Sequence, residues 1–238
     1  WEPRRAETVG NRVRGRPEGA DDPARVEADA AGRDATPSRE APQLAPRTPA
    51  PAAAGQRQAA TPTKTPVCRD PRIDGTMIPQ LVHPSWPCGI AQPVRINAIA
   101  GIRLSTPATL DCNTASRFAT WVTGVLAPAA RQQLGAGVET LWVMGSYACR
   151  RRNNIPSGKL SEHGRGRAID IGGFWLDDGR KVTLAGGWGK GAEGAVLAQA
   201  RARACGLFHT VLGPGSDRHH DDHLHLDTSP RGGEPYCR

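Results

Sequence analysis

The sequence has no apolar run long enough to span a membrane and no visible secretory leader. It begins with Trp1 rather than Met, so we expect a processed or truncated product whose leader or anchor can lie upstream. Aromatic residues make up only 5% of the chain, and neither a helix-turn-helix pattern nor zinc-finger spacing is present. Despite its net charge of +8, the chain therefore lacks the features of a nucleic-acid-binding protein. The basic surplus suits an anionic envelope surface, or simply solubility.

The first 66 residues contain almost no large apolar side chains after Trp1. They are rich in Ala, Pro and Arg, and such a segment cannot bury enough surface to offset the entropy lost on ordering. We therefore predict a disordered tail or linker over residues 1–66. The rest of the chain, residues 67–238, is long enough to form one domain with a core of its own.

None of the six cysteines has Cys-x-x-Cys spacing, and all of them fall in the predicted domain, at Cys68, Cys88, Cys112, Cys149, Cys205 and Cys237. An even number of widely spaced cysteines favours up to three disulfides in an oxidising compartment, such as the periplasm, the cell envelope or the exterior. Reduced core cysteines in a cytosolic protein are the alternative. Spacing leaves the pairing open, and Cys68 with Cys88 and Cys205 with Cys237 are first guesses.

Hydrophobic periodicity predicts an α+β domain in which a small, mainly antiparallel sheet is flanked by helices. Residues 68–88 are rich in proline and predict a loop. Two helices are expected, at 114–134 and 192–205, the first with Asp111 or Asn113 as its N-cap and with a kink or an early end at Pro128. A Gly-rich loop is expected at 186–194. Strands are expected at 94–102, 138–147, 168–174, 181–184 and 208–212, and at the segment that carries His223 and His225.

Four of the seven histidines lie between His219 and His225. The run from His223 to Asp227 alternates with period two, so a strand there places His223, His225 and Asp227 on one face and two leucines on the other. Two imidazoles side by side on a strand begin a metal site, because imidazole is the commonest metal ligand in proteins. Zinc needs a third protein ligand from elsewhere in the chain.

That ligand is expected upstream, where His163 lies in a Gly-rich loop and Asp170 lies between two isoleucines. A carboxylate between two buried apolar residues is unfavourable unless a cation or metal pairs with it. His163, Asp170 and one histidine of the last strand thus form a candidate zinc site with an open position for water, which is the catalytic arrangement. The chemistry of the residues does not separate His223 from His225 as the third ligand.

His-x6-Asp followed by a distal His-x-His resembles the signature of a group of zinc peptidases. This group includes lysostaphin-type endopeptidases, D-alanyl-D-alanine carboxypeptidases and the hedgehog signalling domain. More narrowly, residues 67–238 resemble the bacterial extensin-like C-terminal domain family. The motifs that carry this resemblance are Ser146–Arg150, Leu160–His163, Ala168–Ile171, Val211–Gly215, His220-x-x-His223-x-His225-Leu226-Asp227 and Tyr236–Arg238.

The resemblance implies a hedgehog/D-Ala-D-Ala peptidase-like fold and a role for each residue of the site. His225 takes the third ligand position beside His163 and Asp170, and His223 becomes the general base or transition-state stabiliser. Arg150 contacts a substrate carbonyl or carboxylate, a task that suits a guanidinium. His220 matches a further active-site histidine of some murein endopeptidases, although a simple loop histidine is the alternative reading.

For the other polar residues near these motifs we predict structural roles or exposure to solvent. Asp227 is expected to orient an imidazole, and Ser161 to hold the loop around His163. We expect His83 and His209 to be structural, and His219, Asp221, Asp222, Arg151 and Arg152 to be solvated.

The hypothesis is therefore a monomeric zinc metallopeptidase, a hydrolase that cuts peptide bonds of peptidoglycan. Two alternatives stay open. One is an inactive, zinc-containing module that binds the cell wall. The other is a structural wall protein, for which the Pro-rich tail lacks the regular Ser-Pro repeats.

Overall fold

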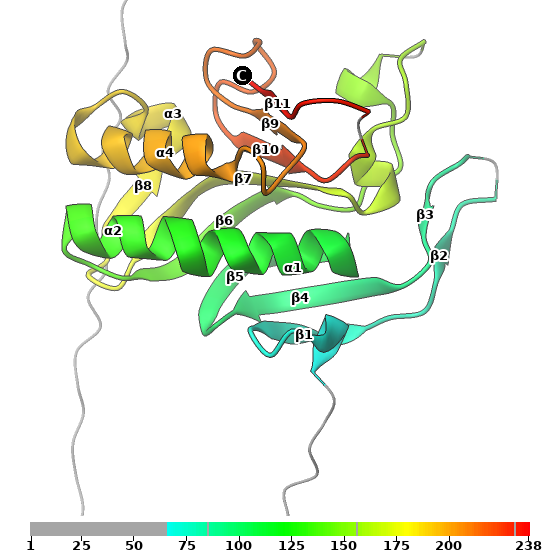
Figure 1. The fold of residues 1–238 in the computed structure, drawn as a ribbon, viewed down its shortest axis with the longest axis horizontal. Coiled ribbons are helices and arrows are strands. Elements are labelled where there is room, and N and C mark those ends of the chain that lie inside the picture. The colour runs from blue at the N-terminus through cyan, green and yellow to red at the C-terminus, as the bar shows by residue number, and fades with distance from the viewer. Residues whose placement is uncertain (1–65, 85, 156, 231) are drawn as a thin grey trace, which may run out of the picture. The chain divides into compact units, whose positions relative to one another are not determined.

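The computed structural model describes residues 66–84, 86–155, 157–230 and 232–238. The tail predicted over residues 1–66 lies outside these ranges apart from Pro66. The described residues form an α+β domain, as the periodicity predicted, with helices on one face of a mixed, mostly antiparallel sheet (Figure 1). Among them, no helix is both long enough and apolar enough to cross a membrane.

Among the described residues the main sheet has nine strands, so it is larger than expected. Its order is β1-β4-β5-β6-β7-β10-β9-β11, with β8 paired to β7, and the pairs β5–β6 and β9–β11 are parallel. The strand bounds are β1 (Ile73–Met77), β4 (Pro93–Ile99), β5 (Ile102–Asp111), β6 (Val138–Gly145), β7 (Ala168–Leu176), β8 (Lys181–Thr183), β9 (Thr210–Leu212), β10 (Leu224–Asp227) and β11 (Tyr236–Cys237). A separate short hairpin pairs β2 (Leu81–Val82) with β3 (Gly89–Ile90).

The strand predicted over 94–102 ends early, because the chain reverses at Ala100 and Gly101. Both residues have positive φ, 48° and 83°, between the paired residues Ile99 and Ile102. Two such residues form the hairpin turn whose twist matches that of the flanking strands. The long strand β5 that follows was not predicted.

The Pro-rich stretch 68–88 is also more ordered than predicted, because it contains β1 and β2. The guessed disulfide between Cys68 and Cys88 is wrong. Cys68 is bonded to Cys112 and Cys88 to Cys149, whereas the guessed pair Cys205–Cys237 is confirmed. The two pairs that spacing missed join segments 44 and 61 residues apart, which only the folded sheet brings together.

The predicted helix 114–134 is present, and it begins two residues earlier, at Cys112. It comprises α1 (Cys112–Trp121), a wide π turn (Val122–Leu126) and α2 (Ala127–Leu134). Asp111 is the N-cap, because its side chain accepts a hydrogen bond from the Thr114 amide at 2.7 Å, and Gly135 ends the helix with φ 72°. Pro128 does not end it. Proline lacks an N–H and its ring crowds the carbonyl four residues earlier, and the π turn lies just before this position.

The second helix is confirmed as α4 (Gly191–Ala204), while the predicted Gly-rich loop 186–194 is largely replaced by α4 and the short α3 (Leu184–Gly187). Helices α1, α2 and α4 lie on the same face of the sheet (Figure 1). They bury one continuous apolar core, in which the Trp121 indole N–H donates to the carbonyl of Ala200 at 2.8 Å. The opposite face of β7 and β10 is therefore free to carry polar side chains.

Candidate metal centre

Strands β7 and β10 are antiparallel neighbours, and their register places His225 directly opposite Asp170. The residues on either side of each, Ile169, Ile171, Leu224 and Leu226, are buried in the core. Since side chains alternate along a strand, His225 and Asp170 both point to the face away from the helices. The predicted alternation of the last strand is thus confirmed, although β10 begins at Leu224 and His223 lies just before it.

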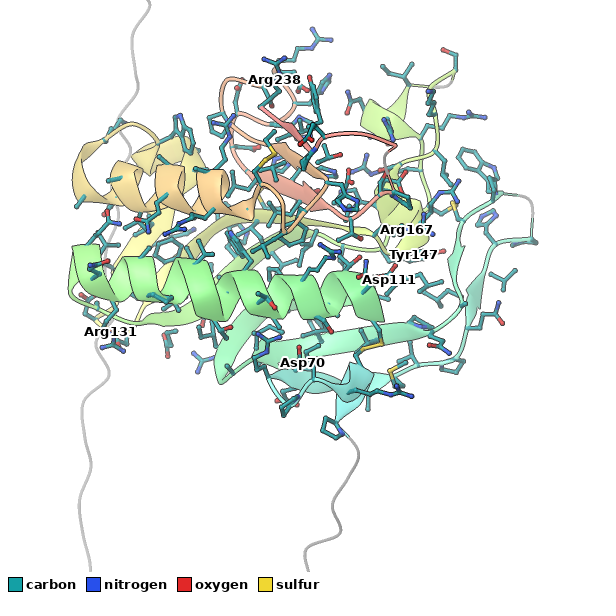
Figure 2. The ribbon with its side chains drawn as sticks, viewed as in Figure 1. Asp70, Asp111, Arg131, Tyr147, Arg167 and Arg238 are labelled. Carbon is teal, nitrogen blue, oxygen red and sulfur yellow. A yellow bond between two sulfur atoms is a disulfide. The ribbon has the colours of Figure 1, made fainter. Side chains whose placement is uncertain are left out.

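His163 comes from a 3₁₀ turn, Glu162–Arg165, that precedes β7. The turn ends at Gly166 with φ 65°, a backbone conformation that favours glycine. It is held in place from outside, because the Gly166 carbonyl accepts a hydrogen bond from the Asp111 amide at 2.9 Å. Figure 2 shows Asp111 and Arg167 close to the start of α1, where the Asp111 carboxylate and the Arg167 guanidinium lie 3.9 Å apart. The His163 side chain is thereby fixed and only 2% exposed.

The structure brings the three predicted ligands together. His163 Nε2 lies 3.2 Å from His225 Nδ1 and 3.1 Å from an Asp170 carboxylate oxygen, and His225 Nδ1 lies 2.9 Å from the other oxygen. In each imidazole the ring nitrogen that points away from this cluster, called here the outer nitrogen, also has a partner. His163 Nδ1 lies 2.7 Å from the Ser146 carbonyl, and His225 Nε2 lies 3.3 Å from an Asp227 carboxylate oxygen. Asp227 therefore orients an imidazole, as the alternation suggested.

These contacts settle which way the electron pairs point. The Ser146 carbonyl and the Asp227 carboxylate only accept hydrogen bonds, so the outer nitrogens donate to them. In neutral imidazoles the inner nitrogens, His163 Nε2 and His225 Nδ1, then present lone pairs toward each other and toward the Asp170 carboxylate. The two inner nitrogens and the Asp170 carboxylate are thus three electron-pair donors that face one another. Their mutual repulsion is relieved only by a cation or a proton between them. Ligands about 2.1 Å from a tetrahedral zinc lie about 3.4 Å apart, so a small outward movement of these three side chains would let the donor set hold this metal.

The electrostatics of these side chains agree with this geometry. Burial acts to raise the pKa of Asp170, but hydrogen bonds from His163 and His225 outweigh it and hold that pKa well below its usual range. Burial acts to lower the pKa of His225, but Asp170 and Asp227 outweigh it and raise it to about 9. Without a metal, the cluster therefore retains a proton at neutral pH.

His223 and His220 lie beside the ligands. The His223 ring centroid is 5.1 Å from that of His220, which in turn is 5.6 Å from that of His225. Each of the two has a carboxylate partner at 2.8 Å from Nδ1, namely Asp222 for His223 and Asp217 for His220. Asp222 is exposed, as predicted, but its contact with His223 was missed, and so was the role of Asp217. His219 is exposed, as expected.

The four histidines from His219 to His225 line a cleft of about 490 Å³, together with His163, Asp170 and Asp217. Arg150 lies in its wall, and its carbonyl accepts a hydrogen bond from the Ser161 amide at 3.0 Å. Arg152, predicted to be solvated, lines the same cleft and forms an ion pair with Glu162. Arg151 is not simply solvated either, because it donates to the Gly158 carbonyl. Only contacts across the loop reveal these roles.

The remaining predictions near the site concern structural residues. His209 is structural as expected, with Nδ1 2.8 Å from the Ser229 carbonyl. His83 contacts the ring of Trp86 edge-on. The predicted support of the His163 turn by Ser161 is confirmed for its backbone, since its carbonyl accepts from the Gly164 amide at 3.0 Å.

Comparison with known proteins gives one match. No curated protein and no solved structure matches the chain. The family described as extensin-like protein C-terminus matches residues 70–238. This range covers the whole main sheet, every bonded cysteine except Cys68, and every residue that lines the cleft. The chain therefore belongs to the extensin-like C-terminal family.

Proposed function

We propose that this protein is a zinc-dependent hydrolase that cuts peptide bonds of peptidoglycan. The observation that carries the proposal is the convergence of His163, Asp170 and His225, with their inner nitrogens and carboxylate oxygens 2.9–3.2 Å apart. The outer nitrogens of both histidines are tied to acceptors, as is usual for histidines that bind metals. Three protein ligands leave one position for water or substrate, which distinguishes catalytic from structural zinc sites.

In this proposal His163, Asp170 and His225 hold the metal. Bound zinc would supply Lewis acidity and lower the pKa of a coordinated water. His223 handles the proton. Its Nδ1 is 2.8 Å from Asp222, so that nitrogen donates, and Nε2 is left to accept a proton at a point 3.7 Å from an Asp170 oxygen. Asp222 keeps the ring in this orientation.

His220 has the same arrangement, with Nδ1 donating to Asp217 and Nε2 available. Burial lowers the pKa of His220 more than Asp217 raises it, so this ring is neutral near pH 7 and suited to accept a proton. Arg150, which also lines the cleft, steadies the developing oxyanion or a substrate carboxylate. The cleft thus provides proton acceptors and an anion site around one metal position.

The substrate class rests on the resemblance to wall-cutting zinc peptidases, and two features of the chain support it. The three disulfides are typical of proteins in oxidising compartments, which include the periplasm and the exterior. The excess of basic residues favours an anionic polymer. A monomer that acts in the envelope on peptidoglycan stem or crosslink peptides is the corresponding proposal.

The test combines metal content with digestion of purified muropeptides. We expect about one zinc per wild-type chain, loss of zinc and of activity in His163→Ala, and unchanged zinc content in His219→Ala, since His219 lines the cleft but lies outside the ligand set. Zinc without cleavage products would favour the inactive wall-binding module. A folded wild-type chain that binds no zinc would overturn the proposal.

A further inference from the structure

Glu162, the residue immediately before His163, has a carboxylate for which the described residues supply too few hydrogen-bond donors. Its side chain is only 11% exposed and lines the cleft. Its Oε2 atom is buried and has no hydrogen-bond partner among the residues that the structure describes. A buried carboxylate oxygen without a donor is unfavourable, so a ligand in the cleft that supplies a donor to the Glu162 carboxylate would stabilise it.

Two ordinary roles do not account for Glu162. It does not belong to the group of side chains whose atoms converge as metal ligands in the described part of the chain, which contains only His163, Asp170 and His225. Its ion pair with Arg152 leaves it unsatisfied, because Arg152 Nη2 lies 3.6 Å from Oε1, beyond hydrogen-bonding distance, and does not reach Oε2.

Arg152 lies next to Glu162 in the cleft wall. Its side chain is 48% exposed and lines the same cleft, so its guanidinium has N–H donors available to a ligand. The cleft wall thus presents an anionic acceptor and a cationic donor next to each other. A ligand group that carries an ammonium and a carboxylate close together can satisfy both at once, the ammonium at Glu162 and the carboxylate at Arg152.

We propose that Glu162 and Arg152 form a subsite that recognises a zwitterionic α-amino-acid group, with an ammonium and a carboxylate on one carbon. The inference deepens the proposed function, because it names the part of a wall peptide that the cleft selects. Such a group occurs where a diamino acid in a stem peptide has a free side-chain end. Glu162 and Arg152 are then specificity-determining residues, while the metal ligands and His223 carry the chemistry.

Binding of three synthetic tripeptides to the full chain tests the proposal. Each peptide ends in diaminopimelic acid and is acetylated at its first residue, so that its one free ammonium lies on the side chain. The first peptide is otherwise unmodified, the second has that ammonium acetylated, and the third has the neighbouring carboxylate amidated. Titration calorimetry gives the affinities, and mass spectrometry of the recovered peptides records any cleavage separately.

For the wild type we expect the first peptide to bind about 10- to 100-fold more tightly than either modified one, since each modification removes a charge-assisted hydrogen bond. Glu162→Gln removes the preference over the acetylated peptide, and Arg152→Gln removes the preference over the amidated one. Glu139→Gln and Lys159→Gln are the matched controls and keep both preferences, because neither residue lines the cleft.

A wild-type chain that binds all three peptides equally would overturn the inference without any variant, and so would a Glu162→Gln chain that keeps the full preference. Zinc content of each variant shows that the neighbouring His163 is still in place. The proposed function fails separately, through missing zinc or missing cleavage products. A chain that binds the zwitterionic peptide selectively but cleaves nothing would support the proposed subsite and contradict only the proposed hydrolase activity.

Discussion

His225 and Asp170 face each other across two antiparallel strands, and His225 Nδ1 lies 2.9 Å from an Asp170 carboxylate oxygen. A one-residue change in the pairing of these strands would turn one of the two side chains into the core. The register is determined by the burial of the apolar neighbours Ile169, Ile171, Leu224 and Leu226. The geometry of the site therefore depends on these four residues as well as on the ligands.

Gly145 lies opposite Asp170 on β6 and provides the space for its carboxylate. A Cβ atom at Gly145 would lie 2.7 Å from Asp170 Oδ2, which is too close for real contacts. We expect Gly145→Ala to displace the carboxylate and to weaken zinc binding, as measured by competition with a chelating dye. Gly124→Ala is the control, since a Cβ there meets nothing within 4 Å and zinc affinity should not change. Equal zinc affinity in both variants would contradict the role of Gly145.

Asp227 acts on the metal through His225. Removing its charge in Asp227→Asn weakens the hydrogen bond that orients the ring, and we expect zinc affinity to fall by about 10- to 100-fold. Asp222→Asn is the matched variant, because Asp222 contacts His223 and not a ligand. It should retain zinc affinity while the hydrolysis rate falls. If the two variants lose zinc equally, the contact between Asp227 and His225 is not what tunes the site.

His223 is placed to accept a proton in the proposed reaction. We expect His223→Ala to lower kcat by about 100-fold or more while zinc content stays near one per chain, since general-base catalysis typically contributes this much. Steady-state kinetics on a defined muropeptide, with zinc measured on the same sample, checks the prediction. Unchanged kcat would reassign the proton transfer, with His220 the next residue to vary.

The metal-free protein should lose stability at alkaline pH. His225 has a pKa raised from 6.5 to about 9 in the folded chain, so folding favours its protonated form. Its contribution to stability is fully present below pH 6.5 and is lost as the pH rises through about 9. Thermal unfolding of chelator-treated protein between pH 6 and 10 should show this decline, and His225→Ala should flatten it. A decline of the same size in the variant would point to other groups.

The disulfide between Cys88 and Cys149 packs against the turn that carries His163, since a Cβ at Gly164 would lie 3.0 Å from Cys88 Sγ. Replacing both cysteines with alanine should lower the free energy of unfolding by about 2–4 kcal/mol and also weaken zinc binding. The same replacement of Cys205 and Cys237, which lie outside the cleft lining, should lower stability and leave zinc affinity unchanged. Denaturant unfolding and zinc titration of both variants test this prediction, and an equal loss of zinc affinity in the two variants would contradict it.

Much of this protein follows from local pattern. The alternation from His223 to Asp227, the helical spacing after Asp111 and the isoleucines around Asp170 each predict an element and the face that a side chain occupies. These features were found because the period of a strand or helix and the preference of apolar groups for burial act within a few residues. The candidate ligand Asp170 could be named for the same reason, whereas His163 was named from its Gly-rich loop and from the motif that resembles zinc peptidases.

The tertiary structure decided what depends on segments far apart in the chain. It paired Cys68 with Cys112, it separated His225 from His223 by setting His225 opposite Asp170, and it placed Arg152 in the cleft. It also left Oε2 of Glu162 buried without a hydrogen-bond donor among the described residues. No local pattern encodes these relations, because they arise when strand register and helix packing bring distant backbone segments to within a few ångströms of each other.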